Sequence, residues 1–142
     1  MNVIEFFYED IDFQLEEPSL VSQWLNQVAQ QFSSKISYIN YIYCSDNYLL
    51  QINKEYLNHD YYTDIITFDQ RDGTETQIEA DIFISIDRIK ENATDQGVQF
   101  LNELHRVTVH GLLHLIGFND KTPAEEIEMR KTEDACLSLL HN

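Results

Sequence analysis

The order in which strand-like and helix-like patterns alternate along this chain places the tightest limit on its fold. Residues 3–8 (VIEFFY) and 35–44 (KISYINYIYC) are rich in β-branched and aromatic side chains, as β-strands are. Each is followed by apolar residues at three- and four-residue spacing, the pattern of one helix face, over residues 18–32 and 46–56. The first part of the chain is therefore predicted to contain two strand–helix pairs, with Ser45 capping the second helix.

Two further strands are expected at residues 64–69 (DIITFD) and 78–86 (IEADIFISI). The polar stretch between them contains Asp72 and Gly73, a dipeptide typical of tight turns. These two strands are therefore predicted to pair as a hairpin.

From Asp87 onward the chain is expected to be helical. A break is expected near Gly97, and a long helix over residues 100–116 should end at Gly117. Residues 122–125 (TPAE) have the form of a capping box and should open a last helix that reaches about residue 140. The elements predict an α+β fold, a single mixed β-sheet of about four strands backed by helices. Because 142 residues is a common size for one domain, residues 1–142 are expected to form a single domain.

The composition of the chain limits where in the cell the protein is expected and which partners it is expected to bind. The first residues lack the basic and apolar regions of a secretory leader, and no stretch is apolar enough to span a membrane, so we expect a cytoplasmic protein. Cys44 and Cys136 form no CxxC pair and are expected to be buried thiols. With 9 Lys plus Arg against 25 Asp plus Glu, the net charge of −16 disfavours a nucleic-acid partner at long range, although a metal ion and a few clustered cations can dominate one cleft.

The segment that carries chemistry is residues 110–120 (HGLLHLIGFND). Residues four apart on a helix differ by about 40° in direction and about 6 Å in height, so His110 and His114 can converge on one ion. If the helix ends at Gly117, the chain folds back and Asp120 can supply a third ligand. Three protein ligands leave a fourth position for water, which is the arrangement of catalytic zinc sites. The alternative is that the histidines are satisfied core residues.

Gly111 stands where a zinc protease of the HExxH type carries its general base, so that kind of proteolysis is not expected. A residue without a Cβ between the two histidines allows the neighbouring sheet or a bulky substrate to approach the helix closely. Simple helix packing would also account for it.

Residues 109–118 (VHGLLHLIGF) resemble the signature of the YbeY family of metal-dependent endoribonucleases that mature ribosomal RNA. Residues 53–56 (NKEY), 62–68 (YTDIITF) and 80–85 (ADIFIS) resemble central sheet motifs of that family in the same order. The resemblance thus covers most of residues 50–120, and the element order agrees over the whole chain.

The resemblance implies zinc held by three histidines, of which the first two fall on His110 and His114. The third falls on Asp120, and a carboxylate in place of an imidazole makes the ion a poorer Lewis acid. The expected cofactor is one Zn²⁺ ion, with another divalent transition metal as the alternative. A ligand shifted to Asn119 is a second alternative.

Another departure is Leu57, where the family has an arginine expected to face the active site. Leucine cannot bind phosphate, so the phosphate-binding part of the mechanism is in doubt. The replacement cations to consider are His59, Lys121 and Arg88. Tyr62 stands where proline is usual, a change that we interpret as conformational only.

Other polar residues near the motif have two interpretations each. Glu103 lies on nearly the same helix face as the first ligand and either orients it or is solvated, whereas His105 lies on a different face and is expected to pack or be exposed. Asp81, within an apolar strand, needs a partner, for which a ligand histidine is one candidate. Thr63 and Asp64 either line the cleft or fix a turn.

The sequence therefore predicts a metal-dependent endoribonuclease acting in ribosomal RNA processing, in which metal-bound water attacks a phosphodiester. Its expected partners are ribosomal RNA and the ribosome or ribosomal proteins. One alternative is a ribosome-associated factor that does not cleave and holds a structural metal, which the acidic surface and Leu57 favour. The other is a metal hydrolase of another small substrate.

Overall fold

In the computed structural model, which describes residues 3–74 and 76–141, the chain forms four strands and five helices. In chain order they are β1 (Ile4–Glu9), α1 (Pro18–Gln31), β2 (Ile36–Cys44), α2 (Asp46–Leu57), β3 (Ile65–Asp69), β4 (Ile78–Ser85), α3 (Ile86–Gln96), α4 (Phe100–Ile116) and α5 (Pro123–Leu140). The sequence predicted each of these elements to within about two residues.

The strands form one mixed sheet in the order β1-β2-β4-β3. The neighbours β1 and β2, and β2 and β4, run parallel, while β3 and β4 pair antiparallel. The predicted hairpin is confirmed, and so is the α+β class with one mixed sheet. Because β4 inserts between β2 and β3, the hairpin places β3 at the edge of the sheet.

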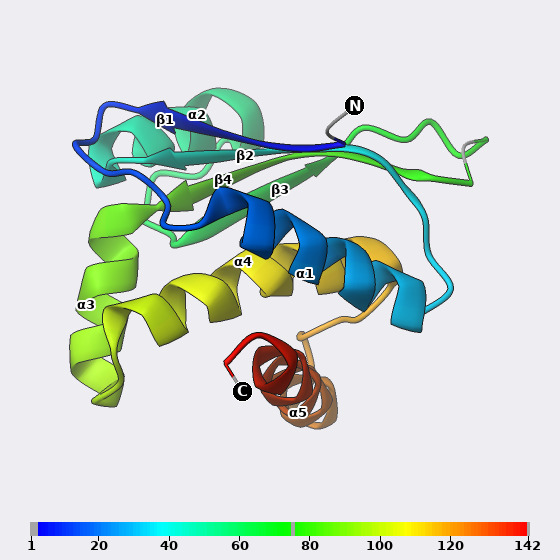
Figure 1. Ribbon diagram of the computed structural model, residues 1–142. Coiled ribbons are helices and arrows are strands. Elements are labelled where there is room, and N and C mark those ends of the chain that lie inside the picture. The colour runs from blue at the N-terminus through cyan, green and yellow to red at the C-terminus, as the bar shows by residue number, and fades with distance from the viewer. Residues whose placement is uncertain (1–2, 75, 142) are drawn as a thin grey trace.

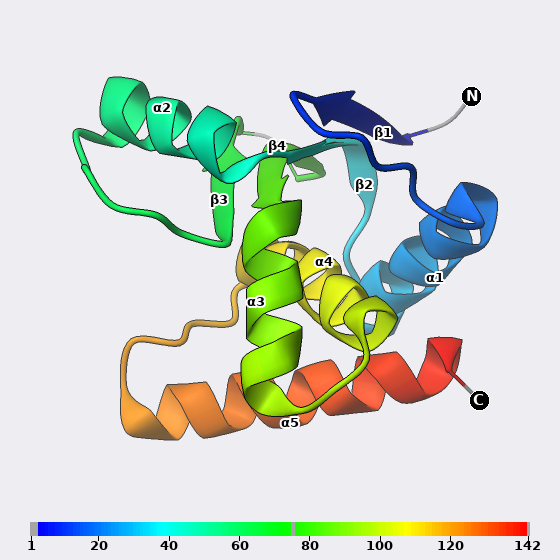
Figure 2. The same cartoon turned by 90° about the vertical axis from the view of Figure 1, so that its left-hand side faces the viewer.

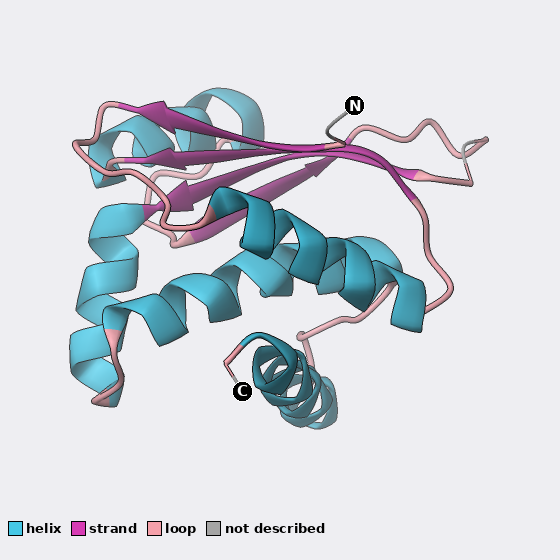
Figure 3. Ribbon diagram, in the orientation of Figure 1, coloured by secondary structure: helices cyan, strands magenta, loops and turns pink. Residues whose placement is uncertain are grey.

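The helices lie in layers on the two faces of the sheet. In Figures 1 and 2, α1 and α4 lie against one face, α5 lies beyond α4, and α3 leads away from the end of β4. The remaining helix, α2, lies on the opposite face, where a small cluster of Cys44, Leu49 and Ile66 is buried. Figure 3 shows the loop that joins α4 to α5, which carries Asp120. The helix with both candidate ligand histidines is thus enclosed between the sheet and α5.

Helix α4 is buried on almost every side, which is expected of an apolar helix at the centre of a domain. Two buried tyrosines of β2 anchor it, because the hydroxyl of Tyr41 donates to the carbonyl oxygen of Thr108 at 2.8 Å and that of Tyr43 lies 3.0 Å from the Thr108 hydroxyl. The position of α4 relative to the sheet is therefore set by hydrogen bonds as well as by packing.

The helix ends follow local sequence signals. Gly97 and Gly117 have positive φ angles of 68° and 127°, and each follows the last residue of a helix. Thr122 and Glu125 form the predicted capping box, with hydrogen bonds of 3.0 and 3.1 Å. The chain therefore reverses direction directly after α4, as the metal-site hypothesis requires.

The two cysteines are buried and unpaired, as predicted. Burial, reinforced by nearby carboxylates, raises the pKa of Cys44 to about 12 and that of Cys136 to about 11. Among the helices of residues 3–74 and 76–141, none is both long and apolar enough to cross a membrane.

Candidate metal centre

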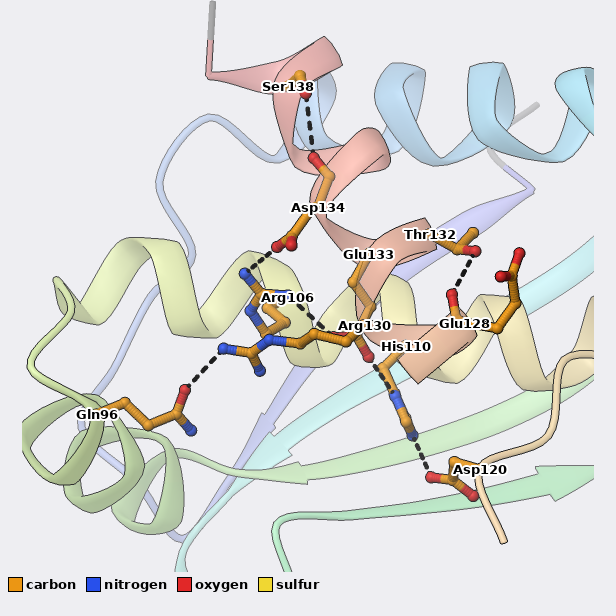
Figure 4. Close-up of polar contacts among 10 residues, drawn as sticks. All are labelled: Gln96, Arg106, His110, Asp120, Glu128, Arg130, Thr132, Glu133, Asp134 and Ser138. Atoms are coloured by element: carbon orange, nitrogen blue, oxygen red, sulfur yellow. Dashed lines mark hydrogen bonds and ion pairs between the residues drawn. The ribbon is translucent and has the colours of Figure 1, made fainter. Parts of the chain in front are cut away.

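The C-terminal part of α4 and the loop after it bring three predicted ligands together. The Nε2 atom of His110 lies 3.4 Å from Oδ2 of Asp120, and the Nε2 atom of His114 lies 3.5 Å from the same oxygen. One ligand atom from each residue falls within 4.8 Å of the others. Figure 4 shows the ring of His110 pointing toward Asp120.

The separation of each histidine nitrogen from the Asp120 oxygen fits a single tetrahedral ion. Bond lengths of about 2.0 to 2.1 Å at a tetrahedral zinc put neighbouring ligand atoms about 3.3 Å apart. The two imidazole rings have centroids 4.7 Å apart and an interplanar angle of 84°, so they do not stack face to face. The three residues can therefore hold a divalent ion and leave one coordination position open to a water or a substrate.

His110 is held in place by a carboxylate from α5. Its Nδ1 atom lies 2.6 Å from Oε2 of Glu133, and because a carboxylate only accepts, Nδ1 must donate. The other oxygen of Glu133 accepts a 3.0 Å hydrogen bond from Arg106, which also donates to Asp134 at 2.6 Å (Figure 4). With its proton on Nδ1, His110 presents the lone pair of Nε2 to the metal position.

Opposing effects act on the pKa of His110. Burial, the largest effect, lowers it, but the hydrogen bond to Glu133 and the negative charges of Glu133, Asp120 and Asp64 together raise it above the usual value. The surroundings thus favour positive charge at this point. A bound cation satisfies the same preference.

A cavity of about 520 Å³ opens onto the three ligands. Thr63 and Asp64 line this cavity. Of the two roles considered for them from the sequence, lining the cleft is the one that agrees with the structure. Burial raises the pKa of Asp64, with the nearby His110 acting in the opposite direction. The wall of the cavity therefore offers a carboxyl that holds its proton to higher pH than usual.

A family model described as Endoribonuclease YbeY matches residues 4–141. The chain belongs to this family. It is 54% identical over 136 residues to the endoribonuclease YbeY of Cytophaga hutchinsonii, an alignment that covers 96% of this chain and 94% of the relative. With the endoribonuclease YbeY of Flavobacterium psychrophilum it shares 48% over 139 residues, covering 98% and 97% of the two chains.

A solution structure of a protein from Thermotoga maritima has the same fold. Its TM-score is 0.63 at 20% identity, and the match covers 94% of this chain and 89% of that one. The predicted family membership and fold class are therefore confirmed.

Glu133 is the residue of the site that the sequence analysis missed. The sequence suggested Glu103 as the orienting carboxylate, but Glu103 is buried and its Oε1 atom has no hydrogen-bond partner among the described residues. A signal was present, since Glu133 falls on the buried stripe of α5 that includes Met129 and Leu137. A carboxylate on such a stripe requires a partner.

Asp81 does not reach a ligand histidine, so that expectation was wrong. Alternation along β4 puts Asp81 on the face of the sheet away from α4. There it accepts hydrogen bonds from Asn40 at 3.0 Å and Gln70 at 3.1 Å. His105 is buried against Trp24, in agreement with the expected packing role.

The family has an arginine where this chain has Leu57. Among the residues that the structure describes, neither Leu57 nor the cations considered as replacements line the cavity at the metal centre. Leu57, at the end of α2, is 40% exposed and lines neither cavity beside the metal centre. Arg88 is committed to Asp46 at 2.9 Å and to Glu91 at 2.7 Å. His59 is stacked on a tyrosine outside the cleft, and Lys121 is exposed.

Gly111 allows the close contact between α4 and the sheet that the sequence predicted. A Cβ at this position would lie 3.0 Å from Cδ1 of Ile82 and 3.1 Å from Cδ1 of Ile65. The missing side chain brings the two ligand histidines to the surface of the β3–β4 pair. The packing alternative and the close-approach alternative therefore describe the same contact.

Proposed function

We propose that this protein is a metal-dependent endoribonuclease that holds one Zn²⁺ ion through His110, His114 and Asp120 and acts in the maturation of ribosomal RNA. The observation that carries the proposal is the distance from the Nε2 atom of each histidine to the same oxygen of Asp120, which fits two ligands of one tetrahedral ion in each case. Membership of a family whose relatives are named endoribonucleases supports RNA as the substrate.

The side chains of the site have different roles in the proposed reaction. A bound divalent ion supplies a Lewis acid and lowers the pKa of water, which makes hydrolysis of a phosphodiester feasible near neutral pH. His110 and His114 bind through Nε2, and Glu133 keeps the proton of His110 on Nδ1. Asp64, whose pKa is raised by burial, lies at the wall of the cavity that opens onto the ligands.

The carboxylate of Asp120 bears on the identity of the ion. Three neutral imidazoles leave the full charge of a divalent ion in place, whereas Asp120 reduces it by one unit and weakens the ion as a Lewis acid. Zinc fits this mixed donor set, and another divalent transition metal is the alternative.

The partners follow from the charge and the family. With a net charge of −16, the protein repels free RNA at long range, so we propose that the ribosome or its basic proteins bring it to ribosomal RNA in the cytoplasm. Residues 1–142 act in this proposal as a single domain.

A second function is favoured by the same charge and by Leu57. The protein would then be a ribosome-associated factor in which the metal stabilises the loop after α4 and no RNA is cleaved. It shares the metal centre with the first proposal and differs in the reaction.

Elemental analysis and RNA cleavage separate these possibilities. The wild-type protein should contain one zinc per chain and cleave structured RNA, and His114→Ala should lose both properties, because two remaining ligands hold the ion poorly. His59→Ala, an exposed histidine outside the centre, is the matched control and should keep both. Zinc without cleavage would support the non-cleaving factor, and full zinc in His114→Ala would remove the centre from these residues.

A further inference from the structure

A second cavity of about 330 Å³ lies directly beside the metal centre, between α3, α4 and α5. It shares Asp64, Ile65, His110 and Asp120 with the cavity that opens onto the ligands. A strand of RNA with one phosphate at the metal centre would therefore have a continuous path into this second space.

Two arginines line the second cavity, and their partners differ. Arg106 is bound to Glu133 and Asp134, so its charge is already balanced. Arg130, from α5, donates one hydrogen bond of 3.1 Å to the amide oxygen of Gln96 on α3. Figure 4 shows the side chain of Arg130 reaching across toward Gln96, past Arg106 and Glu133.

Unlike the other arginines, Arg130 forms no ion pair among the residues that the structure describes, although its charge acts on the nearby Glu103. Arg71, Arg88 and Arg106 each form an ion pair with an aspartate or glutamate. Within residues 3–74 and 76–141, no carboxylate lies within ion-pair distance of Arg130. In a chain with a net charge of −16, an arginine held by a neutral amide at a cavity is available for an external anion.

The geometry points to a phosphate-binding subsite, in which Arg130, steadied by Gln96, binds a backbone phosphate of the RNA strand whose scissile bond lies at the metal centre. This inference rests on the proposed function, because it takes the metal centre as the place of cleavage. A guanidinium has five N–H donors in a planar fork, and Gln96 uses one of them, so a bidentate contact to phosphate remains open.

The carboxylates around the cavity leave room for an anion because most are already engaged. Asp120 faces the metal position, and Glu133 is bound on both oxygens. Asp64 accepts a hydrogen bond of 3.3 Å from Asn92. Glu103 is buried, and the positive charges of Arg106 and Arg130 act on it.

The test compares Arg130→Gln with Lys131→Gln in the zinc-loaded protein. Both changes remove one positive charge from exposed, neighbouring positions of α5, and of the two residues only Arg130 lines the cavity. Fluorescence anisotropy with a labelled single-stranded oligoribonucleotide, measured over a series of salt concentrations, gives the affinity. Steady-state cleavage of the same RNA gives kcat and KM, and elemental analysis and thermal unfolding check zinc and folding.

We expect Arg130→Gln to weaken RNA binding by about tenfold or more, which is typical of a lost charge-assisted contact. The slope of log K against log salt should become shallower by about 0.7, the contribution of one phosphate on a single strand. KM should rise more than kcat falls, and Arg130→Lys should recover part of the affinity. Lys131→Gln should change binding by less than about twofold, because Lys131 lies outside the cavity and its charge acts only through salt-screened solvent.

The outcomes distinguish this subsite from the proposed function. Equal effects of Arg130→Gln and Lys131→Gln, in a protein that cleaves RNA, would overturn the subsite and leave the nuclease in place. A wild-type protein that binds RNA without cleaving it, and loses binding in Arg130→Gln alone, would overturn the nuclease and keep the phosphate contact. Absence of both binding and cleavage in the wild-type protein would overturn both.

Discussion

Replacing Glu133 by glutamine keeps the size of the side chain and removes its negative charge. In the folded protein the two oxygens of Glu133 serve Arg106 and His110 at the same time, at 3.0 and 2.6 Å. A glutamine has a single acceptor oxygen and so can serve only one of them. The variant therefore tests whether this carboxylate orients the metal ligand or only pairs with the arginine.

Two magnitudes follow from the structure. Loss of a carboxylate that orients a ligand histidine typically lowers metal affinity by about ten- to a hundredfold, or about 1.4 to 2.8 kcal/mol. Breaking a buried ion pair costs about 3 to 5 kcal/mol when the remaining charge has no partner. Because Arg106 keeps Asp134 as a partner in Glu133→Gln, we expect the free energy of unfolding of the metal-free protein to fall by about 2 kcal/mol.

Competition with a chromogenic chelator measures the zinc affinity, and urea unfolding of the metal-free protein measures stability. Asp134→Asn is the matched control, since it removes the other partner of Arg106 and does not touch His110. The Asp134 side chain is 60% exposed, so its loss should cost less than about 1 kcal/mol and leave zinc affinity unchanged. Undiminished zinc affinity in Glu133→Gln, or an equal loss in Asp134→Asn, would refute the orienting role.

Three further changes test other parts of the molecule. Asp120→Asn should weaken zinc binding at neutral pH and Asp120→His should restore it, as measured by chelator competition, and equal affinities would place residue 120 outside the site. Gly111→Ala should lower the free energy of unfolding, measured in urea, by about 1 kcal/mol. Crowding of the new methyl group against Ile82 and Ile65 costs about 1 to 3 kcal/mol, and the higher helix propensity of alanine offsets about 1 kcal/mol of this cost. A more stable variant would contradict this prediction. Burial, with a smaller effect of a neighbouring imidazole, lowers the pKa of His105 to about 4 from 6.5, so the unfolded chain binds a proton that the folded one resists. Acidification through this window should therefore remove about 3 kcal/mol of stability relative to His105→Gln, and parallel pH profiles of the two proteins would argue against it.

The features that could be predicted from the sequence are those set by neighbouring residues. The capping box at Thr122 and the reversal at Gly117 depend on contacts within a few positions, and both occur where expected. The convergence of His110 and His114 depends only on helix geometry. Asp120 could be predicted as the third ligand because a helix that ends at Gly117 lets the chain fold back toward the two histidines.

The features that could not be predicted depend on how distant elements pack. Glu133 meets His110 across 23 residues, and the contact exists only because α5 lies on α4. A ligand histidine was a wrong candidate partner for Asp81, because strand alternation shows that successive residues face opposite ways but not which face meets α4. Arg130 approaches Gln96 from a helix 34 residues away. The spacing of residues along the sequence does not show which side chains of separate helices come into contact.

The raised pKa values of the two buried thiols affect how zinc divides between the folded and unfolded chains. With pKa values of about 12 and about 11, Cys44 and Cys136 form almost no thiolate at neutral pH, so they do not compete with imidazole for the metal in the folded state. Unfolding returns both thiols to a pKa of about 8.5 and exposes them as soft zinc ligands. Excess zinc therefore binds the unfolded chain as well, and the gain in thermal stability from added metal should level off at high concentration rather than continue to rise.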